Sequence, residues 1–314
     1  MTLDRLLLGA HTSIAGGYAQ AVDRALAAGF TAMQIFVKNN HQWFPRPQPD
    51  SSFTSFTHHP RLTELGPIVA HAGYLINPAA PEGQNREHSI RALETELELA
   101  EKLSLPLIVI HPGAHVGQGE REGLSQIIRA LDTVVAATPK IRCRIALETT
   151  AGQGTTIGHS FGHIAEILEK VKKPDRFAVC VDTAHLLAAG YDISNAAGYE
   201  KVFSDFDKII GLKWLALLHL NDSKVPLGSH KDRHEHIGRG HIGLAGFRCI
   251  MNDTRFAHIP KILETPKGKE MLEDIENIRK LTGLIKKPKS EPREDKRCKR
   301  KGRGAKRENG GRAS

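Results

Sequence analysis

The chain has 314 residues, of which 40% are hydrophobic and 25% charged, as in an ordinary folded protein. The chain contains no apolar run of about 18 residues, which excludes a membrane span. The segment Met1 to Gly9 lacks the features of a signal peptide. The four cysteines of the chain are scattered along it, which favours a reducing cytoplasm. The net charge of +9 lies entirely in residues 286–314, which hold 13 Lys and Arg against 4 Asp and Glu, so the remaining chain has 31 residues of each sign and no bulk attraction to polyanions.

Short apolar segments alternate with amphipathic segments from residue 6 onward. We predict eight strands, at residues 6–11, 32–39, 67–74, 106–113, 144–150, 177–185, 215–222 and 260–266. Helical periodicity lies between them, for example at residues 17–29, 89–103, 125–137 and 269–281. Nearly continuous apolar strands indicate a parallel sheet covered on both faces. Eight such units predict a single (β/α)8 TIM barrel, an α/β fold, over residues 1–285. A doubly wound sheet is the competing fold, but no Gly-rich phosphate turn follows the first strand.

Residues 286–314 have a different composition, with many Lys, Arg, Gly and Pro and almost no apolar side chains. Such a segment buries too little surface to offset its ordering entropy, so we predict a disordered basic C-terminal tail. The tail either keeps the protein soluble or acts as a non-specific tether to a polyanion.

Ionisable side chains follow the apolar run in all six strands from the third to the eighth. They are His71, His111, Glu148, Asp182 or His185, His219 and Glu264. In a barrel these strand ends meet at one face, where active sites are built. Asp232 and His234 follow the seventh strand, and their i, i+2 spacing in an extended segment points both the same way. A single histidine there is usually structural, but nine such residues predict a site.

The composition of this set favours divalent metal ions. Several carboxylates at one barrel mouth repel one another unless a cation lies between them. Histidine and carboxylate without thiolate suit Zn²⁺, Mn²⁺ or Fe²⁺. Nine candidate ligands are too many for one ion, so we predict two or three ions that share carboxylates. His11 and His115 also lie near strand ends, where they can donate to a ligand or to substrate.

An ordered set of motifs extends along residues 6–283. It includes GAHTSIAGG (9–17), KNNHQW (38–43), HAGYLIN (71–77), HPGAH (111–115), ALETTAGQG (146–154), VDTAHLLAAGYD (181–192), HLNDSK (219–224), DRHEHIGRGHIG (232–243) and ILET (262–265). This set resembles endonuclease IV, the family-2 apurinic/apyrimidinic endonucleases of base-excision repair. The resemblance implies a monomeric TIM barrel with three zinc ions. One ion would be held by His71, His111 and Glu148, a second by Glu148, Asp182, His219 and Glu264, and a third by His185, Asp232 and His234.

The resemblance also implies an activity on double-stranded DNA that contains abasic sites. Hydrolysis of the phosphodiester on the 5′ side would leave a 3′-hydroxyl and a 5′-deoxyribose phosphate, and 3′-end trimming is expected as a second activity. Our hypothesis is that a metal-bound hydroxide attacks, with Glu148, Asp182 and Glu264 as the catalytic carboxylates.

Seven residues are candidates for contact with DNA. We expect Asn39, His41, Trp43 and Tyr74 to fill the gap at the missing base, and Gln153, Lys224 and Arg233 to contact phosphates. His41 departs from the Arg that is frequent in the family at this position, so the detail of insertion is open. Packing within loops is an equally good interpretation for Trp43 and Tyr74.

Two other functions compete with this interpretation. Sugar isomerases and epimerases on related barrels use a Glu, Asp, His, Glu set with one or two ions, which Glu148, Asp182, His219 and Glu264 match. They have no use for the other five candidate ligands, which favours the nuclease. A non-catalytic binder that relies on the basic tail would leave the whole cluster unexplained.

Overall fold

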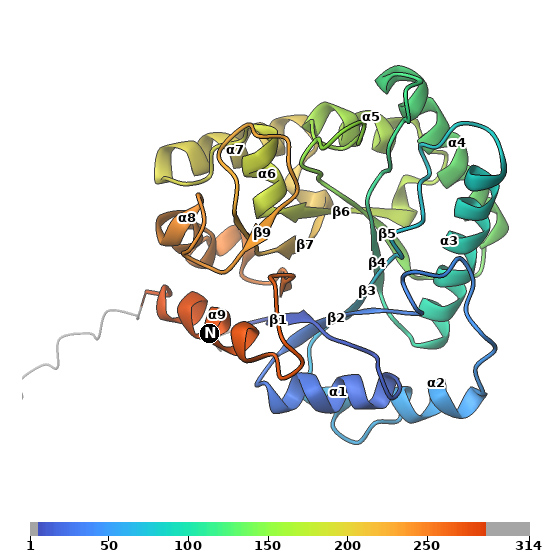
Figure 1. Cartoon of the computed structure of the whole chain (residues 1–314), viewed down its shortest axis with the longest axis horizontal. Helices are drawn as coiled ribbons and strands as arrows, with labels where there is room; N and C mark the ends of the chain where they lie inside the picture. The colour runs from blue at the N-terminus through green and yellow to red at the C-terminus, as the bar shows by residue number, and fades with distance from the viewer. Residues whose placement is uncertain (1–5, 287–314) are drawn as a thin grey trace, which may run out of the picture.

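Eight parallel strands close into a barrel surrounded by helices, which confirms the predicted (β/α)8 fold (Figure 1). The computed structural model describes residues 6–286, so the predicted tail lies outside the described residues except for Lys286. Around the barrel the strands are β1 (Leu8–His11), β10 (Lys261–Leu263), β7 (Leu215–His219), β6 (Phe177–Asp182), β5 (Arg144–Glu148), β4 (Leu107–Ile110), β3 (Ile68–His71) and β2 (Ala32–Phe36). A separate antiparallel pair, β8 (Asp222–Ser223) and β9 (His234–Glu235), lies beyond β7.

Helices cover the outside of the barrel. They are α1 (Tyr18–Ala27), α2 (Asp50–Thr57), α3 (Gln84–Lys102), α4 (Glu120–Ala137), α5 (Phe161–Lys170), α6 (Thr183–Ala189), α7 (Ala196–Ile209), α8 (Gly243–Met251) and α9 (Leu272–Gly283). In the described part of the chain, 3-10 turns lie between them at Leu62–Glu64, Pro174–Arg176, Leu212–Trp214 and Thr254–Phe256. Among residues 6–286, no helix combines the length and the apolar character that crossing a membrane requires.

The apolar side chains form two layers, as expected for strands that are buried on both faces. A small cluster fills the barrel interior, with Val69, Val109, Ala146, Leu217 and Ile262 among its members. A much larger cluster packs between the strands and the helices. The barrel is therefore a filled core, and its open mouth is the place where polar side chains gather.

All eight predicted strands are present, with shorter ends than the apolar runs suggested. β6, for example, ends at Asp182, three residues before the predicted end at residue 185. Asp182 ends the strand and caps α6, since its carboxylate accepts a hydrogen bond of 2.9 Å from the backbone N–H of His185. His185 thus projects from the first turn of a helix, where a carboxylate at the N-cap is favourable.

Candidate metal centre

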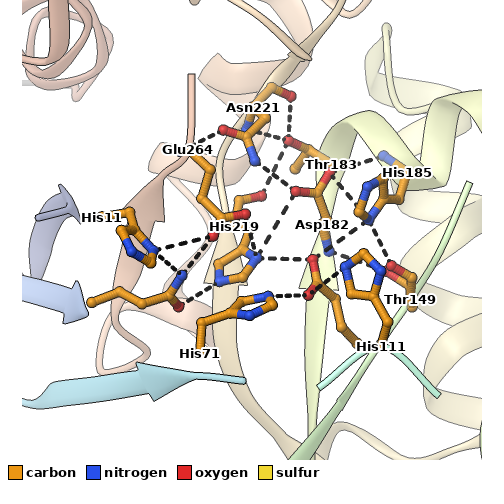
Figure 2. Close-up of polar contacts among 12 residues, drawn as sticks. His11, His71, His111, Thr149, Asp182, Thr183, His185, His219, Asn221 and Glu264 are labelled. Carbon is orange, nitrogen blue, oxygen red and sulfur yellow. Dashed lines mark hydrogen bonds and ion pairs between the residues drawn. The ribbon is translucent and has the colours of Figure 1, made fainter. Parts of the chain in front are cut away.

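The strand ends bring the nine candidate ligands to one mouth of the barrel. His71, Glu148, Asp182 and His219 are the last residues of β3, β5, β6 and β7, while His111 and Glu264 directly follow β4 and β10. Figure 2 shows the rings of His71, His111, His185 and His219 facing one another across this mouth. Asp232 and His234 reach the same place from the segment that ends in β9.

A group of Glu148, Cys180 and His219 also lies here, but burial raises the pKa of the Cys180 thiol to about 12. Three further overlapping groups consist of histidine and carboxylate alone and can each surround an ion. They are His71, His111 and Glu148; Glu148, Asp182, His219 and Glu264; and Asp182, His185 and His234, each with ligand atoms within 4.8 Å of one another. Asp232 belongs with the third group, because its carboxylate oxygens lie 3.2 Å from His185 Nε2 and 3.4 Å from His234 Nε2. Glu148 and Asp182 are each shared between two of these three groups.

The tautomers of the rings suit metal ligation. Three rings donate Nδ1–H to a main-chain carbonyl: His71 to Ala72 (2.8 Å), His185 to Thr149 (2.8 Å) and His234 to Glu264 (3.2 Å). Because a carbonyl only accepts, the neutral form of each ring carries its lone pair on Nε2. Within the described chain, Nε2 of His185 and of His234 is buried without a hydrogen-bond partner. These orphaned atoms fit a metal ion.

His219 is oriented the opposite way. Its Nε2–H donates to Gln34 Oε1 at 2.8 Å, and its Nδ1 faces Glu148 Oε1 at 2.9 Å and Glu264 Oε2 at 3.2 Å. Gln34 Nε2 in turn donates to Glu264 Oε1 at 2.5 Å and lies 3.0 Å from His11 Nδ1. One amide thus orients two candidate ligands.

The buried carboxylates at the barrel mouth are stabilised by positive charge beside them. Burial by itself would raise the pKa of the Glu148 carboxyl, yet His219 and the other rings around it hold that pKa well below its usual range. Burial would lower the pKa of the His185 imidazole, but Asp182 and Asp232 raise it well above its usual range. Buried carboxylates that stay ionised attract cations, and a divalent metal ion is attracted more strongly than a protonated imidazole.

Two supporting residues were missed in the sequence. Gln34 is a polar residue inside the apolar run of β2, and this interruption was the available signal. Asn221 is fully buried; its Nδ2 donates to Asp182 Oδ2 at 2.6 Å, and its Oδ1 accepts from the Glu264 N–H at 2.7 Å. His115, by contrast, accepts from the Gly119 N–H at 3.0 Å within its own loop.

The predicted DNA contacts surround this mouth, except for one. A cavity of about 350 Å³ is lined by six of the candidate ligands and by His11, Phe36, Tyr74 and Lys267. Tyr74 is 67% exposed, and its ring lies 6.1 Å from that of His41. Asn39, Gln153, Lys224 and Arg233 are also exposed. Trp43 is half-buried, packed against the core and 5.4 Å from the His88 ring.

Comparison with known proteins adds independent information. The family described as "Xylose isomerase-like TIM barrel" matches residues 22–281. A "Probable endonuclease 4" from Geobacter sulfurreducens is 47% identical over 279 residues, which cover 89% of this chain and 94% of that protein. The crystal structure of endonuclease IV from Thermus thermophilus matches with a TM-score of 0.78 and 34% identity, over 88% of this chain and 98% of that one. A D-tagatose 3-epimerase-like protein matches with a TM-score of 0.66 at 18% identity, over 89% and 97% of the two chains, a likeness of fold alone.

Proposed function

The chain belongs to the endonuclease IV family, and from that membership we propose that its nine converging side chains hold three divalent metal ions that cleave DNA. The protein is an endonuclease of DNA repair that acts at apurinic/apyrimidinic sites. Zinc is the first candidate, with manganese or iron as substitutes.

The observation that carries this proposal is the sharing of Glu148 and Asp182 between neighbouring groups. A shared carboxylate can bind two ions through its two oxygens. Glu148 Oε2 faces His71 at 3.3 Å and His111 at 3.2 Å, while its Oε1 faces His219 at 2.9 Å. Glu148 and Asp182 would therefore each serve two neighbouring ions, and this overlap supports a site for three ions.

When bound, the ions supply a nucleophile by lowering the pKa of water to about 7, and they neutralise the charge of the phosphoryl oxygens. The side chains around them hold and orient the phosphodiester. Among the described residues, no serine, threonine or cysteine lines the cavity. We propose that the enzyme cleaves on the 5′ side of the abasic sugar and leaves a 3′-hydroxyl and a 5′-deoxyribose phosphate. We also propose that it trims 3′ ends.

The exposed loops beside the cavity are suited to an extruded abasic sugar. A missing base lowers the cost of extrusion, because nothing needs to be unpaired. We propose that Tyr74 and His41, which contact one another on the surface, enter the gap, with Asn39 beside them and Trp43 supporting the loop from below. Gln153, Lys224 and Arg233 would contact the phosphates.

The substitution Glu148→Gln tests the proposal. It removes the charge that two groups share and retains the shape, so we expect nicking of an abasic duplex to fall by several orders of magnitude and bound metal to fall below the wild-type ratio. Single-turnover cleavage and elemental analysis measure both effects. The exposed residue Glu98 provides the matched control, since Glu98→Gln should leave both unchanged. Near-normal cleavage by the Glu148 variant would refute the assignment.

A further inference from the structure

A second group of histidine and carboxylate side chains lies outside the barrel mouth. It consists of Glu120, the first residue of α4, together with His159 and His163, which lie just before and within α5. The Glu120 side chain is 53% exposed and those of His159 and His163 are 25% and 13% exposed, so an ion can reach them from solvent. The mechanism proposed above uses none of the three.

The distances within this group are too long for good hydrogen bonds. His159 Nε2 lies 3.4 Å from Glu120 Oε1, and His163 Nε2 lies 3.6 Å from Glu120 Oε2. Hydrogen bonds to a carboxylate are usually about 2.7–2.9 Å long. Two ligands of a tetrahedral ion with bonds of about 2.1 Å are separated by about 3.4 Å. The spacing therefore matches ligands around an ion better than it matches direct hydrogen bonds.

The same arrangement occurs at the barrel mouth. There Asp232 has one oxygen 3.2 Å from His185 Nε2 and the other 3.4 Å from His234 Nε2. In both places one carboxylate lies between two imidazoles, with a different oxygen facing each ring. The His159 and His163 rings are perpendicular, at a centroid distance of 4.8 Å, so their nitrogens can converge without stacking.

The hydrogen bonds of the rings set the expected affinity. His159 Nδ1 donates to the Thr156 carbonyl at 3.0 Å, which leaves a lone pair on the Nε2 that faces Glu120. His163 Nδ1 instead accepts from the Gly158 N–H at 3.4 Å, and ligation through Nε2 would require that hydrogen bond to be given up. At this length the loss of that hydrogen bond costs little. Because only three protein side chains would bind the ion, we expect a dissociation constant in the micromolar range.

From these contacts we propose that Glu120, His159 and His163 form a peripheral site for one divalent transition-metal ion, such as Zn²⁺. The ion would connect the start of α4 to the segment between β5 and α5. That segment already pairs with the loop after β4, through the bridge between Ala114 and Thr156 and the His115 N–H bond to Thr155 O at 3.0 Å. Occupancy would therefore stabilise both loops against heat.

Calorimetric titration of the purified holoenzyme with Zn²⁺ tests this site. The wild-type protein should bind one equivalent beyond its resident metal, with micromolar affinity, and its melting temperature should rise as zinc is added. The double variant His159→Ala, His163→Ala should lose that equivalent and that rise. The substitution His258→Ala, at an exposed histidine elsewhere, is the matched control and should behave like the wild type.

The exposed position of Glu120 supplies a second variant that does not threaten folding. Glu120→Gln removes the ligand charge and should weaken the extra equivalent by about tenfold or more. All variants should nick abasic DNA at the wild-type rate, which confirms that they are folded and that the barrel mouth is intact. Two results would overturn the site: no additional zinc in the wild type, or undiminished binding by the double variant.

Discussion

Asn221 illustrates how a residue outside the candidate ligand set can control the site. Its amide holds Asp182 and the backbone of Glu264 at the same time, at 2.6 Å and 2.7 Å. Asn221→Ala removes both hydrogen bonds and leaves a buried N–H without an acceptor. Because outer partners of metal ligands typically contribute about 10–100-fold in affinity, we expect metal to be released at correspondingly lower chelator concentrations. Chelator competition followed by elemental analysis measures the change.

Two variants make that prediction specific. Asn221→Asp keeps the acceptor for the Glu264 N–H but places a carboxylate against Asp182, so it should impair metal retention in a different way, by repulsion. Asn85→Ala, at an exposed asparagine of α3, should have no effect. If Asn221→Ala retained metal as firmly as the wild type, the positioning role would be wrong.

The strand-end residues were predictable, because each follows an apolar run and all parallel strands end at one face. Asn221 and Gln34 were not, because their role depends on side chains that meet across the barrel. A single polar residue inside β2 signals a buried polar contact without identifying its partner.

A buried ion pair connects the loop after β2 and the loop after β3, which are the two loops that we expect to contact DNA. Lys38 Nζ lies 2.9 Å from Glu96 Oε1 of α3, and both side chains are buried. Lys38 also donates to the Gln42 carbonyl at 2.5 Å, and the Glu96 carboxylate accepts from the Gly73 N–H at 3.1 Å. The pair thus fixes the loop after β2 and the loop after β3 to one helix.

Glu96→Gln should therefore weaken substrate binding and lower stability together. The Lys38 charge would be left buried without its partner, a loss of about 3–5 kcal/mol in the free energy of unfolding. The loops that carry His41 and Tyr74 would lose their common support, so KM for abasic duplex should rise while kcat changes less. Denaturant unfolding and steady-state nicking measure the two quantities.

A double substitution separates these effects. Lys38→Met with Glu96→Leu replaces the pair by apolar side chains of similar size and should restore most of the stability. It cannot restore the hydrogen bonds to Gln42 and Gly73, so the raised KM should persist. Recovery of KM along with stability would show that the pair has no positioning role.

Element boundaries were harder to predict than element identity. The apolar run of β6 continues through Thr183 and Ala184 into α6, and both of these residues are buried. Hydrophobicity alone could not separate strand from helix there. The separation depends on the cap that Asp182 makes with the His185 N–H, a contact that becomes visible only in three dimensions.

The whole barrel has a functional end and an opposite end, and Lys261 lies at the opposite one. This lysine begins β10, is 2% exposed, and donates to the carbonyls of Phe256 at 2.6 Å and Ile259 at 2.9 Å. Burial lowers the pKa of Lys261 from 10.5 to about 8. Since the unfolded chain binds this proton more tightly, the resulting loss of stability is fully present below pH 8 and disappears as the pH rises toward 10.5.

We therefore expect the wild type to gain stability over Lys261→Met by about 3 kcal/mol as the pH rises from about 7 to about 10.5. Other titrating groups, including those at the metal centre, are common to both proteins and cancel in the difference. Denaturant unfolding at several pH values measures it. A difference that stays constant with pH would contradict the lowered pKa.

The basic C-terminal segment carries the net charge of the whole protein. Truncation after Lys286 removes 12 Lys and Arg and 4 Asp and Glu, leaving 32 basic and 31 acidic residues. If the segment tethers the enzyme to DNA, truncation should weaken binding to undamaged duplex at low salt. It should also make binding less dependent on salt: the slope of log binding constant against log salt concentration should become shallower by about 0.9 for each phosphate that the segment no longer neutralises. Cleavage of already bound abasic duplex should be unchanged, because the candidate metal centre lies within the described barrel.

A chain of full length with the basic residues after Lys286 replaced by Gln separates charge from length. It should behave like the truncated protein, since counterion release depends on charge alone. Binding curves at several salt concentrations, measured on the same duplex with and without one abasic site, distinguish the tether from the barrel mouth. Equal affinity of the full and truncated proteins for undamaged DNA at low salt would leave the segment with a solubilising role only.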